Sequence, residues 1–94
     1  MRNGIYRLRI PHETADLIKG LHPELKRKIK SALKAILSEP DAGKALKDEL
    51  SGLRSYRVGR LRIIYSLYKK EIRIVAVGPR AKIYLETYRL LKKS

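Results

Sequence analysis

The stretch from Arg54 to Tyr84 constrains the fold more than any other part of the chain. It begins within the first of three short runs rich in β-branched and aromatic residues, and only two residues separate each run from the next. The runs are Leu53–Val58, Leu61–Tyr68 and Glu71–Val77, joined by Gly59-Arg60 and Lys69-Lys70. Each run predicts a strand, and two-residue turns join antiparallel neighbours. We therefore expect the three strands to form a meander.

Helical periodicity surrounds this predicted meander. Ile5–Ile10 alternates apolar and charged residues and predicts one further strand, after which His12–Leu21 is expected to be a short helix. A longer helix is predicted from Pro23 onward, because apolar residues recur there with a period of about 3.6 residues. Lys44–Gly52 fits either another helical turn or an irregular crossover, and Ala81–Lys92 returns to helical spacing.

The predicted order of elements is strand, two helices, three strands and helix. The helical hairpin needs an apolar surface to cover, and only the sheet offers one. The sequence thus predicts a two-layer α+β fold, in which the N-terminal strand and the helical hairpin pack on a mainly antiparallel four-stranded sheet, with a C-terminal helix. Ninety-four residues fit a single domain spanning residues 1–94.

Positive charge is the strongest compositional signal. The chain has 23 Lys and Arg residues against 9 Asp and Glu residues, for a formal net charge of +14. The excess is concentrated in residues 51–94, which hold 12 basic and 2 acidic side chains. A field this one-sided attracts polyanions, so nucleic acid is the expected partner and an acidic protein the second. On the helix after Pro23, a basic face either contacts phosphates or is merely solvated; it comprises Lys26, Arg27, Lys30 and Lys34.

Several kinds of active site lack their parts in this sequence. Cys is absent, and both histidines, His12 and His22, lie in the first quarter of the chain, where they are expected on the surface or as helix caps. The basic half contains only Glu71 and Glu86, too few carboxylates for a two-metal centre. No glycine-rich phosphate loop is present. We therefore expect no metal and no cofactor. The lack of Cys, of a signal peptide and of a long apolar span favours a soluble cytoplasmic protein without a membrane partner.

Arginine and tyrosine remain as candidate functional residues. Arg62 leaves the middle strand on the face opposite Ile63, Arg57 lies across the two-residue turn, and Arg80 directly follows the third strand. We expect these three guanidiniums to converge, where each could hold a phosphate bidentately. Tyr84 comes one helical turn after Arg80 and is expected beside it, either in the core or stacked on an unpaired base.

The motifs that carry these residues resemble a known family. RSYRVGRLRIIY, followed by a strand and then VGPRAKIY, is similar to the RelE branch of the RelE/ParE toxin superfamily, and HPELKRKIKSALKAILSEP resembles a helix of that family. The resemblance implies a toxin of a type II toxin–antitoxin pair. For RelE-like members it further implies an endoribonuclease (mRNA interferase) that enters the ribosomal A site, contacts ribosomal RNA and cleaves the mRNA by 2′-hydroxyl attack, without a metal.

The same resemblance implies roles for individual residues. Arg62 and Arg80 match catalytic arginines that stabilise the phosphate and assist the leaving group, and Tyr84 matches a tyrosine that orients the nucleotide. Arg57 matches a basic strand residue that binds the RNA backbone. Further positive charge for RNA binding is expected from Arg54, Arg60 and Lys82.

Two positions depart from the RelE-like pattern and leave alternatives open. Ser55 stands where these toxins often carry a second basic residue, which puts the general base in question, and Pro79 replaces a residue that is commonly polar. A ParE-like inhibitor of DNA gyrase without nuclease activity is therefore the second hypothesis, and a non-catalytic RNA-binding module is the third. The family also implies an acidic antitoxin that wraps the basic sheet in a toxin–antitoxin hetero-oligomer.

Overall fold

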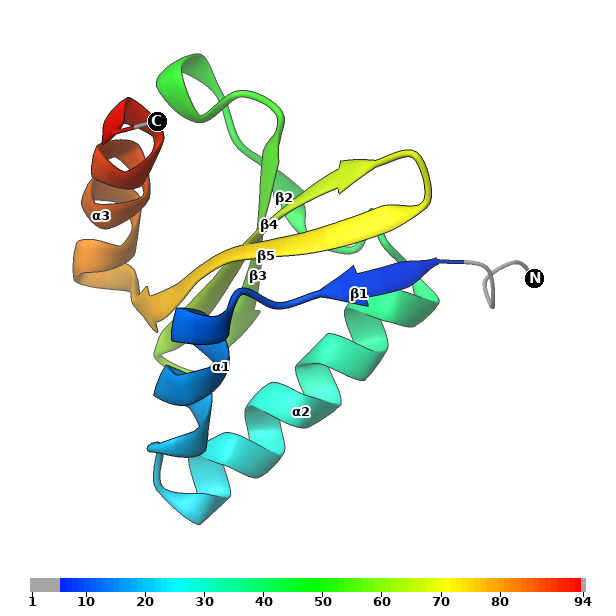
Figure 1. Ribbon diagram of the computed structural model, residues 1–94, viewed down its shortest axis with the longest axis vertical. Helices are drawn as coiled ribbons and strands as arrows, with labels where there is room; N and C mark the ends of the chain where they lie inside the picture. Colours follow the sequence, from blue (N-terminus) through cyan, green and yellow to red (C-terminus); the bar gives the residue numbers. More distant parts are fainter. Residues whose placement is uncertain (1–5, 94) are drawn as a thin grey trace.

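The computed structural model describes residues 6–93, which form a mixed five-stranded sheet with three α-helices (Figure 1). The elements are β1 (Arg7–Arg9), α1 (His12–Lys19), α2 (Pro23–Ser38), β2 (Lys44–Ala45), β3 (Leu53–Val58), β4 (Leu61–Tyr68), β5 (Glu71–Pro79) and α3 (Arg80–Lys93). Ile5, the first residue of the expected N-terminal strand, lies outside the described residues. The predicted α+β fold class is confirmed.

The sheet has the strand order β1-β5-β4-β3-β2. β3, β4 and β5 form the predicted antiparallel meander, and β1 pairs with β5 in parallel. The segment that the sequence left open, residues 44–52, supplies the short fifth strand β2 and one 3₁₀ turn, Asp48–Leu50. β2 pairs with only the first part of β3, through Ser55 and Arg54. The edge of β3 beyond Ser55 therefore has no neighbouring strand among the described residues.

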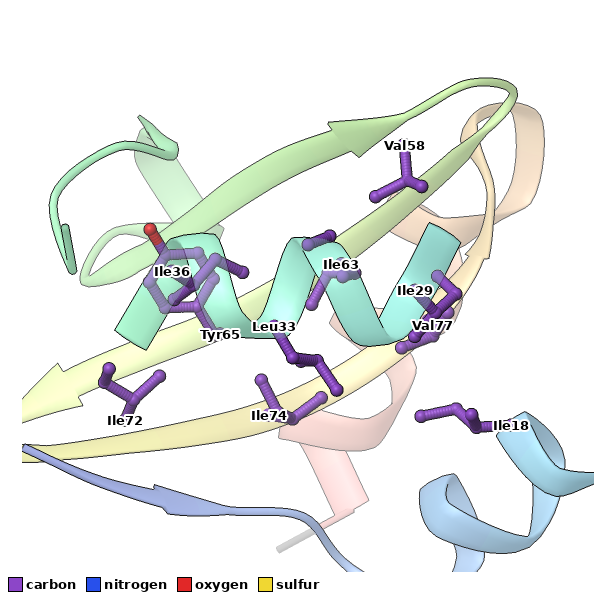
Figure 2. Close-up of a cluster of buried hydrophobic side chains, with 11 residues drawn as sticks. Ile18, Ile29, Leu33, Ile36, Val58, Ile63, Tyr65, Ile72, Ile74 and Val77 are labelled. Carbon is purple, nitrogen blue, oxygen red and sulfur yellow. The ribbon is translucent and has the colours of Figure 1, made fainter. Parts of the chain in front are cut away.

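The main core lies between the sheet and the helices α1 and α2 (Figure 2). α2 begins at Pro23, and the Nδ1 atom of His22 accepts a hydrogen bond from the backbone of Glu24 at 3.3 Å, which caps its first turn. The apolar stripe of α2 faces β4 and β5, as its 3.6-residue period predicts. Fully buried members of this core are Ile29, Ile36, Ile63, Tyr65, Ile72 and Ile74.

A second, smaller core lies on the opposite face of the sheet, beneath α3. Its buried members are Leu53, Ile64, Ala76 and Ile83. Because β4 alternates, Ile63 faces the first core and Ile64 the second, and this explains why the adjacent apolar residues lack polar alternation. α3 leaves the end of β5 and packs against this face (Figure 1), so side chains on the same face at the β3–β4 turn lie next to the start of α3. None of the helices in the described part of the chain is long and apolar enough to cross a bilayer.

Candidate functional site

Arg57 on β3 and Arg62 on β4 lie directly opposite each other. The turn between the strands begins with Gly59, whose φ of 61° suits glycine and matches the right-handed twist of a hairpin. The carbonyl of Leu53 accepts from Leu46 N at 2.9 Å, so alternate residues of β3, Arg57 among them, direct their backbone groups away from β4. Arg57 and Arg62 consequently form a non-hydrogen-bonded pair, the arrangement in which facing side chains lie closest.

Arg80 reaches the same place from β5. The last residue of that strand, Pro79, pairs with Leu61 at the start of β4, and α3 begins at the next residue. The backbone N–H of Arg80 donates to the carbonyl of Arg60 at 3.3 Å, which ties the start of α3 to the β3–β4 turn. The structure thus brings Arg57, Arg62 and Arg80 together at one end of the sheet.

These arginines line one cavity of about 370 Å³, which we call the arginine cavity. Its lining residues are Arg57, Gly59, Arg60, Arg62, Pro79, Arg80 and Ala81. No carboxylate lines it, and the salt bridges found among residues 6–93 involve only Arg9, His12 and Arg73 as cations. Four arginines therefore share one small volume without a protein anion to offset their charge. Because a planar guanidinium binds phosphate oxygens in a bidentate way, the cavity is suited to a phosphodiester.

A buried hydroxyl connects the cavity to Tyr84. The Nη1 atom of Arg62 donates to Ser55 Oγ at 3.4 Å, and Ser55 Oγ lies 3.1 Å from the Tyr84 hydroxyl. Ser55 is only 2% exposed, so its hydroxyl bonds to protein groups and not to bulk water. The chain of contacts holds Arg62 towards α3 and orients the half-buried Tyr84 beside it. On the other side, Arg57 Nε donates to the carbonyl of Gly59 at 3.3 Å.

Two of the predicted RNA-binding residues do not line this cavity. Arg54 donates through Nη1 to the carbonyls of Gly43, at 2.6 Å, and Asp41, at 3.2 Å, and thus stabilises the loop before β2. Lys82 is exposed on α3 and is not among the residues that line the arginine cavity. Arg60, in contrast, lines the cavity together with the three predicted arginines.

Ser55 is the residue whose part in this site the sequence did not reveal. From the sequence it is only a departure from the RelE-like pattern, whereas the structure makes it the hydrogen-bonding link between Arg62 and Tyr84. Alternation along β3 would have found it, because residues 53, 55 and 57 share one face and residue 55 pairs opposite Ile64, a residue of the second core.

The titratable groups in and around the cavity are arginine and tyrosine. Far along β4, burial raises the pKa of the Tyr65 hydroxyl above its ordinary value of 10.0. That hydroxyl donates to the carbonyl of Pro40 at 2.7 Å and accepts from Gly43 N at 2.9 Å, within the first core. In the described part of the chain, no three His, Asp or Glu side chains are grouped closely enough to hold a metal ion.

Comparison with protein families gives a match over most of the chain. Residues 5–84 match the family described as the ParE toxin of the type II toxin–antitoxin system, parDE. No curated protein sequence matches the chain at a significant level.

Solved structures with the same fold are also found. The archaeal RelE–RelB complex from Pyrococcus horikoshii OT3 contains a chain with 26% identity and a TM-score of 0.68, the match covering 83% of this chain and 98% of that chain. The toxin–antitoxin complex RelBE2 from Mycobacterium tuberculosis gives 26% identity and a TM-score of 0.71, covering 80% and 98%. The isolated RelE toxin of Escherichia coli shares the fold at 18% identity and a TM-score of 0.68, covering 92% and 98%.

Proposed function

This chain belongs to the ParE toxin family of type II toxin–antitoxin systems, and we propose that it acts as a ribosome-dependent endoribonuclease that cleaves translated mRNA. One observation carries the proposal: four arginines line a single cavity that no carboxylate borders, and one of them is linked through Ser55 to a tyrosine. The similarity at 26% identity to chains from RelE–RelB and RelBE2 complexes supports the nuclease branch of the superfamily.

The proposed reaction is an internal transesterification of RNA. The 2′-oxygen of one nucleotide attacks the adjacent phosphorus, the bond from phosphorus to the 5′-oxygen of the next nucleotide breaks, and a 2′,3′-cyclic phosphate remains. The 2′-hydroxyl proton passes to water, and the departing 5′-oxygen takes a proton from water. Negative charge accumulates on the phosphate oxygens in the transition state, and preorganised cations stabilise it there more than in the ground state.

The residues of the arginine cavity divide this work. Arg62 and Arg80 bind the non-bridging oxygens and the leaving oxygen, and Arg57 with Arg60 holds the neighbouring backbone. Tyr84, whose hydroxyl is fixed by Ser55, packs against the sugar or base. The ordinary pKa values of arginine and tyrosine side chains lie far above neutral, so neither kind of side chain is an efficient proton acceptor at pH 7. The ribosome completes the site by aligning the mRNA for attack.

An acidic antitoxin is the proposed protein partner. Two of the chains similar to this one come from toxin–antitoxin complexes, RelE–RelB and RelBE2. The formal net charge of +14 and the uncompensated arginines offer such a partner a large electrostatic attraction. We propose that the two proteins form a hetero-oligomer in the cytoplasm, in which the antitoxin neutralises the arginine cavity.

Inhibition of DNA gyrase is the second candidate function. Two observations favour it: the matching family is that of ParE toxins, and Ser55 occupies a position that is often basic in RelE-like nucleases. The two functions separate on induction in living cells. A nuclease stops protein synthesis and leaves mRNA cut within reading frames, which primer extension maps to single nucleotides. Intact mRNA with double-strand DNA breaks would contradict the nuclease and support the gyrase inhibitor.

Arg80 provides the sharpest test of the site. Arg80→Ala removes a cation from the arginine cavity, and the loss of one preorganised charge stabiliser lowers a rate by about 10²–10³-fold. The rate of mRNA cleavage on programmed ribosomes should fall by that factor. Arg89→Ala is the matched control, because Arg89 is also an exposed arginine of α3 and does not line the cavity. Equal cleavage rates in the two variants would contradict the assignment.

A further inference from the structure

A second basic cavity lies between α2 and β3, which we call the α2–β3 cavity. It has a volume of about 470 Å³, within the range of small-ligand sites. Its lining residues are Arg27, Lys28, Ser31, Ala32, Tyr56, Arg57 and Val58. Three of them are cationic, two have a hydroxyl, one of these two also has an aromatic ring, and none has a carboxylate. This is the chemical composition of a nucleotide site rather than that of an apolar groove.

The α2–β3 cavity and the arginine cavity share one lining residue, Arg57. A strand that contacts Arg57 in one cavity is therefore within reach of the other. β2 covers β3 only at Arg54 and Ser55, and the alternation of β3 directs the backbone N–H and C=O of Arg57 to the open edge between the cavities. A free backbone N–H at this edge is an additional donor for a phosphate oxygen.

The individual side chains suit the parts of one nucleotide. The guanidinium of Arg27 and the ammonium of Lys28 are exposed on the first half of α2, where they can bind phosphate oxygens. Ser31 lies one helical turn after Arg27 on the same helix face. Tyr56 is half-buried and offers part of its ring, and an aromatic face stacks on any unpaired base.

We infer that the α2–β3 cavity is a second nucleotide subsite, which binds the single-stranded RNA next to the phosphodiester held in the arginine cavity. The inference rests on the proposed function, because it takes the occupant of the arginine cavity to be RNA. The aromatic ring and the shared Arg57 favour RNA over an acidic peptide, since a carboxylate side chain does not stack on an aromatic ring and a base does. The subsite gives Arg27 and Lys28 of α2 a specific ligand, the substrate strand itself.

The test compares two charge-matched double variants of the full chain. Arg27→Gln/Lys28→Gln removes two cations that line the cavity, and Lys30→Gln/Lys34→Gln removes two exposed cations of the same helix that do not. The probes are fluorescent 2′-O-methyl oligoribonucleotides of two and six nucleotides, which cannot be cleaved because the attacking hydroxyl is blocked. Affinity is measured by anisotropy at several salt concentrations.

The expected result is specific to the longer probe and to the first pair of substitutions. Arg27→Gln/Lys28→Gln should weaken binding of the six-nucleotide probe about tenfold and flatten the slope of log K against log salt by about 1.4, which corresponds to two lost phosphate contacts at about 0.7 each. Binding of the two-nucleotide probe, which occupies only the arginine cavity, should change less than twofold. Lys30→Gln/Lys34→Gln should leave the salt slope unchanged. An equal loss in both double variants would overturn the inference, because only net charge would then matter.

Substitutions of Tyr56 distinguish the contribution of base stacking to RNA affinity from that of charge. Tyr56→Leu should weaken the six-nucleotide probe about fivefold or more without changing the salt slope, and Tyr56→Phe, which keeps the ring, should restore the affinity. If Arg27→Gln/Lys28→Gln weakens binding of a polyglutamate peptide and not of RNA, the cavity binds a protein partner and the inference is wrong. Because the probes are uncleavable, these outcomes are independent of catalysis. If the six-nucleotide probe behaves as expected but mRNA stays uncut in cells, only the nuclease proposal is contradicted.

Discussion

Repulsion between the guanidiniums of Arg57 and Arg62 should lower the stability of the free protein. They face each other as a non-hydrogen-bonded pair on β3 and β4, and no carboxylate lines the cavity they share. Like charges directly opposite in a sheet destabilise by about 0.2–1 kcal/mol. Arg57→Gln should therefore stabilise the fold by about 0.5 kcal/mol at low salt, a rise in Tm of about 2–4 °C for a domain of this size.

A double-mutant cycle isolates the repulsion from other effects. Each single substitution also breaks a hydrogen bond, from Arg57 to the Gly59 carbonyl or from Arg62 to Ser55, but these single-site costs cancel when Arg57→Gln, Arg62→Gln and the double variant are combined. Thermal unfolding at about 0.02 M salt should give a repulsive coupling of about 0.2–1 kcal/mol. At 1 M salt, where the Debye length is about 3 Å, the coupling should disappear. Arg89→Gln controls for the general relief of a chain with a formal net charge of +14.

The same substitution should have the opposite effect on RNA binding. A phosphate between the two guanidiniums turns their repulsion into joint attraction, so Arg57→Gln should lower the affinity for RNA while it raises Tm. A coupling of zero at low salt, or an Arg57→Gln variant less stable than Arg89→Gln, would refute the argument that the two charges face each other unpaired.

Three further predictions concern the Tyr65 hydroxyl, which is hydrogen-bonded to the backbone of Pro40 and Gly43. Tyr65→Phe should lower the free energy of unfolding by about 1–3 kcal/mol, because a buried N–H and C=O lose their partner, whereas Tyr56→Phe should change it far less. Burial raises the pKa of Tyr65 above 10.0, so on raising the pH this tyrosine ionises in the unfolded chain before it ionises in the folded one. The free energy of unfolding should therefore fall as the pH rises above 10. The contribution of Tyr65 to this fall should be absent in Tyr65→Phe. Gly43→Ala should cost about 1–3 kcal/mol in urea unfolding, since a Cβ would lie 2.6 Å from the Tyr65 hydroxyl; an unchanged midpoint would show that the loop can move aside.

Local patterns in the sequence predict most of the fold because its central part is local. The β3–β4–β5 meander follows from three apolar runs and two-residue turns, and the turns fix the register where each strand pair begins. A β-bulge at Ile64/Tyr65 then shifts the pairing of β4 with β5 by one residue, and the turns do not predict it. The placement of Arg62 on the face opposite Ile63 needs only the two-residue period of a strand. The pairing of β2 with β3 joins residues that are about ten positions apart and depends on a two-residue strand, too short to leave a periodic signal.

The composition of the site was less predictable because part of it is set by packing across the sheet. The contact of Tyr84 with Ser55 exists because α3 docks on the second core through Ile83, and the angle of a docked helix is not encoded in neighbouring residues. Arg54 illustrates the reverse case. Residues 54 and 57 lie on opposite faces of β3, so strict alternation already separates Arg54 from the arginine cavity, and the structure places its guanidinium on loop carbonyls.

Ser55 links the physical character of the site to its proposed dependence on the ribosome. A basic side chain at this position would stand in the strand next to Arg62; the hydroxyl instead accepts from Arg62 and meets Tyr84, and it cannot take a proton near neutral pH. The site thus orders charge around a phosphate without providing an efficient base. Charge stabilisation alone accelerates cleavage only when the 2′-oxygen, the phosphorus and the leaving oxygen are already in line, because unaligned RNA spends most of its time in conformations that cannot react. A free RNA strand bound by these arginines should therefore be held and rarely cut, and the alignment must come from a second body that fixes the mRNA backbone.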